Sequence, residues 1–97
     1  MPLIVLVRFK IKPAMAEQFL TRVRQQAVDS LANEPACRSF DVAVDPADRA
    51  NVLLYEIYDD RAAFDAHLAS AHFKHFDAEV SSWFEEKVVE LWMGPLG

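Results

Sequence analysis

The sequence is poor in the features that mark several large classes of protein. It contains only two glycines and one cysteine, which excludes collagen-like repeats and disulfide-rich scaffolds. No run of lysine or arginine is long enough to follow a phosphate backbone, and the formal net charge is −5, so we expect no nucleic-acid partner. The apolar stretch Leu3–Val7 has no basic leader and is followed at once by Arg8 and Lys10. We therefore expect neither a signal peptide nor a membrane span.

What the chain does contain is typical of one small globular domain. It has 97 residues, 53% of them hydrophobic, and we expect a single domain over residues 1–97. A folded chain of this length buries only somewhat more than about 60% of its unfolded surface, so burial against a partner would help. The lone Cys37 cannot form an intrachain disulfide, and we expect it to be a small buried residue in a cytoplasmic protein.

Four segments have the composition and alternation of β-strands, and two have the periodicity of helices. The predicted strands are Leu3–Ile11, Cys37–Asp45, Val52–Tyr58 and Lys87–Met93. The first helix follows Pro13 and ends at Glu34-Pro35, because a residue before proline is disfavoured in the α conformation. The second helix begins after Asp59-Asp60 and is broken near Ser70. A polar turn, Pro46–Ala50, joins the second and third strands into a hairpin.

Apolar residues at intervals of three and four predict which faces of the helices are buried. In the first helix the stripe consists of Met15, Phe19, Leu20, Val23, Ala27, Val28 and Leu31. In the last helical piece it consists of Phe73, Phe76, Val80 and Phe84.

The order strand, helix, strand, strand, helix, strand predicts an α+β fold of the ferredoxin-like, split βαβ type, with helices on one face of an antiparallel sheet. The other face also needs a cover. Leu6, together with Leu54 and Tyr58 or with their neighbours of opposite parity, is too apolar to remain in water. We therefore predict a homodimer in which two sheets meet across a two-fold axis.

Three stretches, read together, connect this sequence with a known family. They are Glu34-Pro35-Ala36-Cys37, Tyr55-Glu56-Ile57-Tyr58, and the run AFDAHLASAHFKHF at residues 63–76. In this combination the chain resembles the antibiotic biosynthesis monooxygenase superfamily, which includes small quinol monooxygenases. The resemblance implies a dimeric α+β barrel in which a small aromatic substrate meets dioxygen in an apolar pocket, without flavin, haem or metal. An electron-rich quinol supplies its own electrons, so the protein needs mainly a base and a dry pocket.

Two histidines are the candidate catalytic residues. His67 lies three residues after Phe64, at the edge of the buried stripe, where an imidazole can enter a pocket and act as the base. His72 begins the second helical piece and is expected to point back toward His67 as its helper. His75 is expected to face solvent. A spacing of five without a third ligand is a weak metal signature, so we expect no metal.

The expected substrate-binding residues are aromatic, apart from one acid. They are Phe40, Tyr55, Glu56, Tyr58, Phe64 and Phe73. For Glu56 the strand pattern leaves two alternatives: burial at the dimer interface beside a cation such as Arg8, or a place in the pocket.

Other activities of related proteins remain alternatives. A sister group of isomerases that act on a phosphorylated dione shares the Tyr-Glu-x-Tyr strand and the spacing of His67, His72, Phe73 and Lys74. In the haem-degrading branch, the resemblance implies Asn, Trp and His where this chain has Val7, His67 and Asp77, which argues against haem. A non-catalytic dimer that binds a small molecule is the third possibility.

Overall fold

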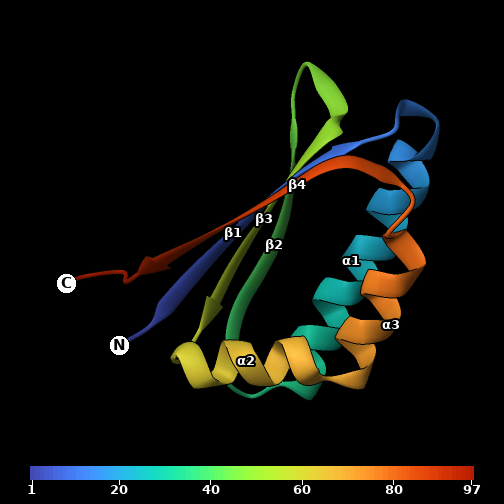
Figure 1. Ribbon diagram of the computed structural model, residues 1–97. Helices are drawn as coiled ribbons and strands as arrows, with labels where there is room; N and C mark the ends of the chain where they lie inside the picture. The colour runs from blue at the N-terminus through green and yellow to red at the C-terminus, as the bar shows by residue number, and fades with distance from the viewer.

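A four-stranded antiparallel sheet with helices packed against one face forms the structure, a computed structural model that describes residues 1–97 (Figure 1). The elements in chain order are β1 (Leu3–Ile11), the short 3-10 helix η1 (Pro13–Met15), α1 (Ala16–Asn33), β2 (Cys37–Asp45), β3 (Asp48–Tyr58), α2 (Arg61–Ala69), α3 (Ala71–Val80) and β4 (Phe84–Met93). The strand order in the sheet is β2-β3-β1-β4. This arrangement confirms the predicted α+β ferredoxin-like fold.

Strand alternation decides which residues reach the core. In β1, Val5, Val7, Phe9 and Ile11 are buried beneath the helices. Because β3 is paired with β1 in register, with Val7 opposite Leu54, the inward residues of β3 include Leu54 and Tyr58. Leu54 and Tyr58 therefore do not lie on the outer face with Leu6. Their neighbours along β3 lie there instead, which is the second of the two predicted alternatives.

Polar side chains define where the helices of the second half begin and end. Asp60 caps α2 by accepting the Ala63 N–H at 2.8 Å. Ser70 ends α2 and caps α3, because its hydroxyl donates to the His67 carbonyl at 2.7 Å and accepts the Phe73 N–H at 3.2 Å. The predicted break at Ser70 is confirmed, and it turns the chain so that α2 and α3 run in different directions (Figure 1).

Two element boundaries differ from the prediction. β3 begins at Asp48 rather than Val52, because Asp45 accepts the Ala47 N–H at 2.9 Å and a two-residue turn is sufficient. Phe84 starts β4 instead of extending the last helix, which ends at Val80. The ring of Phe84 packs edge-on against Phe9, with 5.3 Å between the ring centroids. Phe84 therefore points into the core from a strand, although its spacing in the sequence also fitted the buried face of a helix.

The buried stripe of α1 also differs in its last two turns. Phe19, Leu20, Val23 and Ala27 are buried as predicted, but Val28 is 59% and Leu31 is 46% exposed. Gln26 and Ser30 take their place and are almost fully buried. This end of α1 therefore presents polar groups to α3, which is the basis of the site described below.

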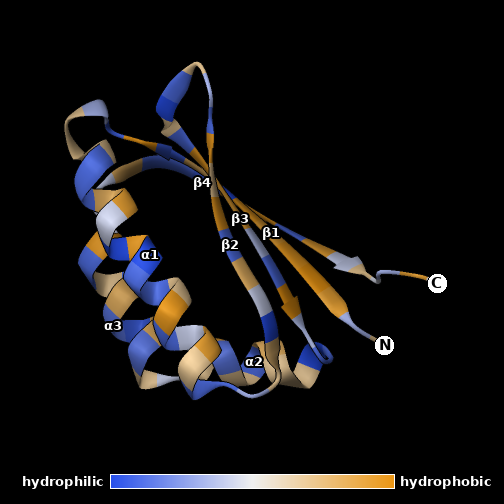
Figure 2. Cartoon of the chain, turned by 180° about the vertical axis from the view of Figure 1, so that it is seen from behind, coloured by the Kyte–Doolittle hydropathy of each residue, from blue (hydrophilic) through white to orange (hydrophobic).

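The outer face of the sheet carries apolar side chains and no helix. Its apolar residues include Leu6, Leu53, Tyr55, Ile57, Val88 and Trp92. Figure 2 shows apolar residues along most of β1, and Val88 and Trp92 are at least half exposed. No helix of the structure is long and apolar enough to cross a membrane.

Candidate functional site

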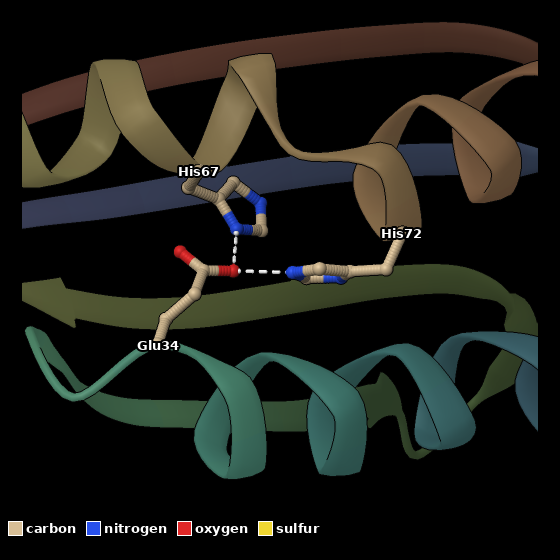
Figure 3. Close-up of side chains that lie close together, drawn as sticks. All are labelled: Glu34, His67 and His72. Atoms are coloured by element: carbon tan, nitrogen blue, oxygen red, sulfur yellow. Dashed lines mark hydrogen bonds and ion pairs between the residues drawn. The ribbon is translucent and has the colours of Figure 1, made fainter.

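Three polar side chains meet between the end of α1 and the helices α2 and α3 (Figure 3). Glu34 follows the last turn of α1, His67 lies on α2 and His72 lies on α3. The Oε2 atom of Glu34 lies 2.8 Å from Nδ1 of His67 and 2.7 Å from Nε2 of His72. Glu34 has an extended backbone because Pro35 follows it, and this ends the helix where its side chain reaches both histidines.

His67 is more deeply buried than the predicted position at the edge of the stripe, with only 2% of its surface exposed. Aromatic rings surround it: Phe73 at 4.9 Å, Tyr58 at 5.3 Å and Phe64, stacked at 6.3 Å between centroids. Burial lowers the pKa of the His67 imidazole, although the hydrogen bond and charge of Glu34 act in the opposite direction. The imidazole is therefore kept neutral near pH 7, as a general base must be.

The contact with Glu34 decides which nitrogen of His67 is basic. A carboxylate accepts the proton on Nδ1, so the lone pair is then on Nε2. No protein group hydrogen bonds to Nε2 in the structure. The pair has the arrangement of a base oriented by a carboxylate, which also stabilises the imidazolium that forms when the base takes a proton.

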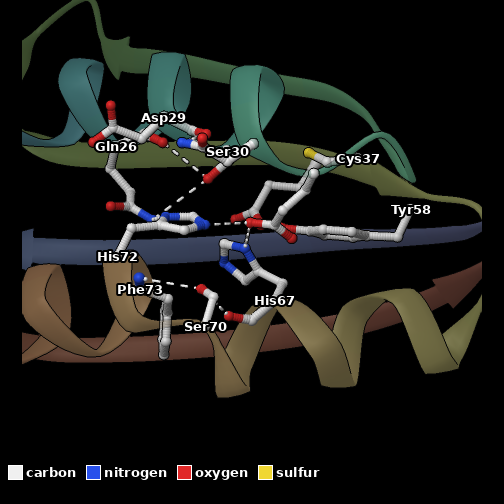
Figure 4. Close-up of polar contacts among 12 residues, drawn as sticks. Gln26, Asp29, Ser30, Cys37, Tyr58, His67, Ser70, His72 and Phe73 are labelled. Atoms are coloured by element: carbon white, nitrogen blue, oxygen red, sulfur yellow. Dashed lines mark hydrogen bonds and ion pairs between the residues drawn. The ribbon is translucent and has the colours of Figure 1, made fainter.

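His72 is held from the opposite side by Gln26 (Figure 4). The Gln26 amide nitrogen lies 3.0 Å from Nδ1 of His72, and it also lies 3.4 Å from the Ser30 hydroxyl. In this orientation the amide donates to Nδ1, so the proton of His72 is on Nε2, facing Glu34. Although Nε2 lies at ion-pair distance from Glu34, the direction of the contact is not that of a hydrogen bond, and both Nε2 and the Gln26 carbonyl oxygen remain buried without a partner.

A small cavity of about 40 Å³ borders His67. Its walls include Phe40, Glu56, Phe64, Phe73, Phe76, Leu54 and Lys87. Since a water molecule occupies about 30 Å³ in the liquid, this space holds about one water and no aromatic ring. A substrate that contains an aromatic ring can enter only if wall side chains such as Phe73, which is only partly buried, move aside.

Two charged side chains face this cavity from the sheet. Glu56 is 3% exposed, and its carboxylate accepts the Tyr58 hydroxyl at 2.6 Å. Burial raises the pKa of Glu56 to about 7, and burial together with the Glu56 charge raises the pKa of Tyr58. Lys87 projects from β4 over the rings of Phe9 and Phe73, at 5.7 and 5.9 Å. The cavity thus combines an aromatic wall with one cation and one acid that titrates near neutrality.

The structure brings most of the predicted site residues together. Phe40, Glu56, Phe64, His67 and Phe73 line the cavity, Tyr58 contacts His67 behind it, and His72 adjoins His67 through Glu34. The prediction for Tyr55 is wrong for this cavity, because it lies opposite Leu6 on the outer face and is 37% exposed. His75 is exposed, as expected.

For Glu56 the pocket alternative is correct, and the pairing with Arg8 is wrong. Arg8 lies on the outer face of the sheet and forms an ion pair with Glu90 at 3.3 Å. Adjacent residues of a strand point to opposite faces, and Glu56 lies opposite Val5, an inward residue of β1.

Sequence reasoning missed three residues of the site: Glu34, Gln26 and Lys87. In the sequence, Glu34 was used only as the end of a helix and as part of the stretch Glu34-Pro35-Ala36-Cys37, and Lys87 only as the start of a strand. The one available signal was the position of Gln26, which lies three residues after Val23 and seven after Phe19, on the same side of α1 as the predicted apolar stripe. A polar residue at such a position indicates a buried hydrogen-bonding role.

The larger depressions of the surface contain no histidine that could act as a base. The largest, about 720 Å³, is an open groove between α1 and β2 whose charged residues are Arg24, Asp41 and Arg49, without a histidine. A second, about 480 Å³, lies by the β2–β3 hairpin and the ends of β1 and β4. The small cavity at His67 is the better candidate, because it alone joins apolar walls to a buried base.

Comparisons with known proteins agree with this fold. The family described as antibiotic biosynthesis monooxygenase matches residues 2–79. A Mycobacterium tuberculosis protein named for a proposed monooxygenase activity is 30% identical over 95 residues, which cover 98% of this chain and 92% of that protein. An uncharacterized Synechocystis protein is 29% identical over 77% of this chain, which spans only 50% of that relative's length. A solved Nitrosomonas europaea structure, described as a proposed antibiotic biosynthesis monooxygenase, has a TM-score of 0.91 at 25% identity, covering 97% of this chain and 99% of its own.

Proposed function

We propose that this chain, which belongs to the antibiotic biosynthesis monooxygenase family, is a cofactor-independent monooxygenase that oxidises a small aromatic quinol with dioxygen. The observation that carries the proposal is the buried His67, oriented by Glu34 at 2.8 Å and bordering an aromatic cavity. In this proposal the protein is a cytoplasmic homodimer. Its one cysteine, Cys37, is buried with a pKa raised to about 11, which suits a structural thiol in a reducing compartment.

The first step of the proposed reaction is removal of a phenolic proton. Nε2 of His67 takes the proton from the quinol hydroxyl, and the carboxylate of Glu34 stabilises the resulting imidazolium through Nδ1–H. The quinolate that remains is a much stronger electron donor than the neutral quinol. His72 supports this step by its contact with the same Glu34 oxygen.

The quinolate then reacts directly with dioxygen. One oxygen atom enters the ring, the other leaves as water, and the quinol supplies all four electrons, two from its oxidation to the quinone and two from the hydroxylated carbon. Lys87 is the one cation of the cavity wall, and its ammonium stabilises the negative charge that passes from quinolate to oxygen. Phe40, Phe64 and Phe73 supply the apolar surface that excludes water.

Oxygen consumption by the purified protein tests this proposal. Chemically reduced benzoquinols and naphthoquinols are offered as substrates, and uptake is measured above the rate of their autoxidation. We expect catalysed uptake with a hydroxylated quinone as product, identified by mass spectrometry with ¹⁸O-labelled dioxygen. The absence of catalysed uptake across the panel would refute the proposal.

An isomerase is the second candidate, because enolisation of a dione also needs only a base and a stabilised oxyanion. The observation that favours it is the same His67–Glu34–His72 group. The phosphate it requires would have only Lys87 of the cavity wall to bind it, since Lys74 is exposed and Arg8 and Lys10 are paired with acids on the outer face. Isomerisation that continues without oxygen would favour this candidate. A dimer that only binds small molecules would show neither activity.

The proposed homodimer covers the apolar outer face of the sheet. We expect sedimentation equilibrium at micromolar concentration to give a mass twice the 11.0 kDa of one chain. Tyr55→Asp places a charge at the centre of this face, on β3. We expect this variant to be monomeric, because burying an unpaired carboxylate in the interface is energetically unfavourable. Ala62→Asp, an exposed change on α2, is the control and leaves the dimer intact. A wild-type monomer would contradict the prediction.

A further inference from the structure

We propose that Glu34, His67 and His72 form a binding site for a divalent transition-metal ion. Their ligand atoms, one carboxylate oxygen and two imidazole nitrogens, all lie within 4.8 Å of one another. Each residue comes from a different element, so the packing of α1 against α2 and α3 assembles the site. The sequence spacing gave no sign of it, because the third ligand lies 33 residues before His67.

The distances are close to those of a metal centre. Ligand atoms bound tetrahedrally to one zinc-like ion at about 2.0–2.2 Å lie about 3.3–3.6 Å from each other. The two contacts at Glu34 are 2.8 and 2.7 Å, so each must open by about 0.5 to 0.9 Å for an ion to enter between the three atoms, all of which lie within 4.8 Å of one another.

The orphaned atoms beside His72 indicate how the site adapts. Nε2 of His72 and the carbonyl oxygen of Gln26 are both buried without a hydrogen-bond partner. Turning the Gln26 amide by 180° lets its oxygen accept a hydrogen bond from Nδ1–H of His72, which leaves the lone pair of Nε2 free to bind a metal. A hydrogen-bond acceptor behind a ligating imidazole is the usual means of fixing its tautomer, and the Gln26 side-chain oxygen would be that acceptor here. Gln26 is therefore a positioning residue of the site.

The donor set suits a transition metal. Two imidazoles and one carboxylate bind Zn²⁺ and Fe²⁺ well, whereas Mg²⁺ and Ca²⁺ prefer oxygen ligands alone. Three protein ligands leave at least one coordination position open for water or another small ligand. The side chains of Glu34 and His72 are 15% and 20% exposed, so an ion can reach the site from solvent.

Metal binding and the proposed base exclude each other. A metal on Nδ1 of His67 displaces the proton to Nε2, where the lone pair of the base would otherwise lie. In the proposed oxygenase the ion is therefore an inhibitor, and chelation restores activity. This consequence depends on the proposed function, whereas binding of the metal itself does not.

Binding is tested without substrate or oxygen turnover. Zn²⁺ is titrated by calorimetry into the chelator-treated protein, and Co²⁺ is followed by its visible absorption, which reports coordination in the unaltered chain. We expect one ion per chain. Glu34→Gln and His72→Ala are expected to weaken binding by more than about 100-fold. Gln26→Leu is expected to weaken it by about 10- to 100-fold, the usual effect of removing the hydrogen-bond partner of a metal ligand.

His75→Ala is the matched control. His75 and Glu79 form the other histidine–carboxylate pair of α3, 3.9 Å apart and exposed, and they are the natural site for adventitious binding. We expect His75→Ala to leave binding unchanged. Binding that is lost with His75→Ala, is unaffected by both Glu34→Gln and His72→Ala in variants with normal circular dichroism, or is weaker than about 1 mM in the unaltered chain would overturn the proposal.

Discussion

His67→Ala is expected to lower the turnover number for quinol-dependent oxygen uptake by about 10²- to 10⁴-fold, the usual contribution of a positioned general base. No other neutral base borders the cavity: Glu56 is held by the Tyr58 hydroxyl at 2.6 Å, and Lys87 is a cation. The effect is expected in the turnover number more than in KM, because the proton is transferred only as the quinol reacts. Initial rates over a range of quinol concentrations separate the two.

Two further variants make this result specific to the proton transfer. His67→Gln keeps a polar side chain of similar size and therefore controls for the cavity that alanine leaves in the aromatic cluster. Glu34→Gln removes the charge that stabilises the imidazolium but retains a hydrogen-bond acceptor, so we expect a smaller loss than for His67→Ala. His75→Ala, on the exposed side of α3, is expected to leave turnover unchanged. Full activity of a folded His67→Gln variant would rule out His67 as the base.

The sequence predicted the fold well because the fold depends on local patterns. Alternation in β1 and the caps at Asp60 and Ser70 are each set by residues close together in the chain. The hairpin between β2 and β3 followed from a short polar segment, and only the length of its turn was wrong. Most elements formed where an interval of two, or of three and four, predicted them; the exception is Phe84, which follows Val80 at a helical spacing but lies in β4.

The site was only partly predictable, because it depends on contacts between distant elements. His67 and His72 were identified because His67 lies three residues after Phe64, at the edge of the buried stripe, and His72 begins the helical piece after the break near Ser70. Glu34 and Gln26 were missed because their roles depend on how α1 lies against α3, which no local pattern reports. Tyr55 was misplaced for a simpler reason: aromatic residues occur on both faces of β3, and the parity of its inward side is known only from its register with β1.

Glu56 is expected to make the stability of the protein fall as pH rises toward neutrality. Its pKa is about 4.5 in the unfolded chain and about 7 in the folded one, mainly because burial disfavours the carboxylate. Between these values the folded state binds more protons than the unfolded state, so the free energy of unfolding decreases as pH rises through this window. The full shift corresponds to a loss of about 3 kcal/mol, at about 1.4 kcal/mol per pKa unit.

Glu56→Gln removes this titration and keeps a polar side chain that can accept the Tyr58 hydroxyl. Relative to the wild type, the free energy of unfolding of the variant should therefore rise by about 2 to 3 kcal/mol from about pH 5 to about pH 8. Urea unfolding at both pH values, at one fixed protein concentration so that any dimerisation contributes equally, measures the change. Glu17→Gln is the control: Glu17 is exposed, and its bond to Arg49 lowers its pKa, so its titration lies below this window.

If the free energies of unfolding of the wild type and of Glu56→Gln change with pH in the same way, Glu56 is ionised throughout this range in the folded protein, and the prediction is wrong.

The ionisation of Glu56 also affects the cavity, because Glu56 and Lys87 both line it. When Glu56 is protonated, the ammonium of Lys87 is the only charge on the cavity wall and favours an anionic quinolate. When Glu56 ionises, the two charges oppose each other. The pH at which the fall in stability levels off, near the folded pKa of about 7, should therefore also be the pH above which the wild type, but not Glu56→Gln, binds the quinolate more weakly.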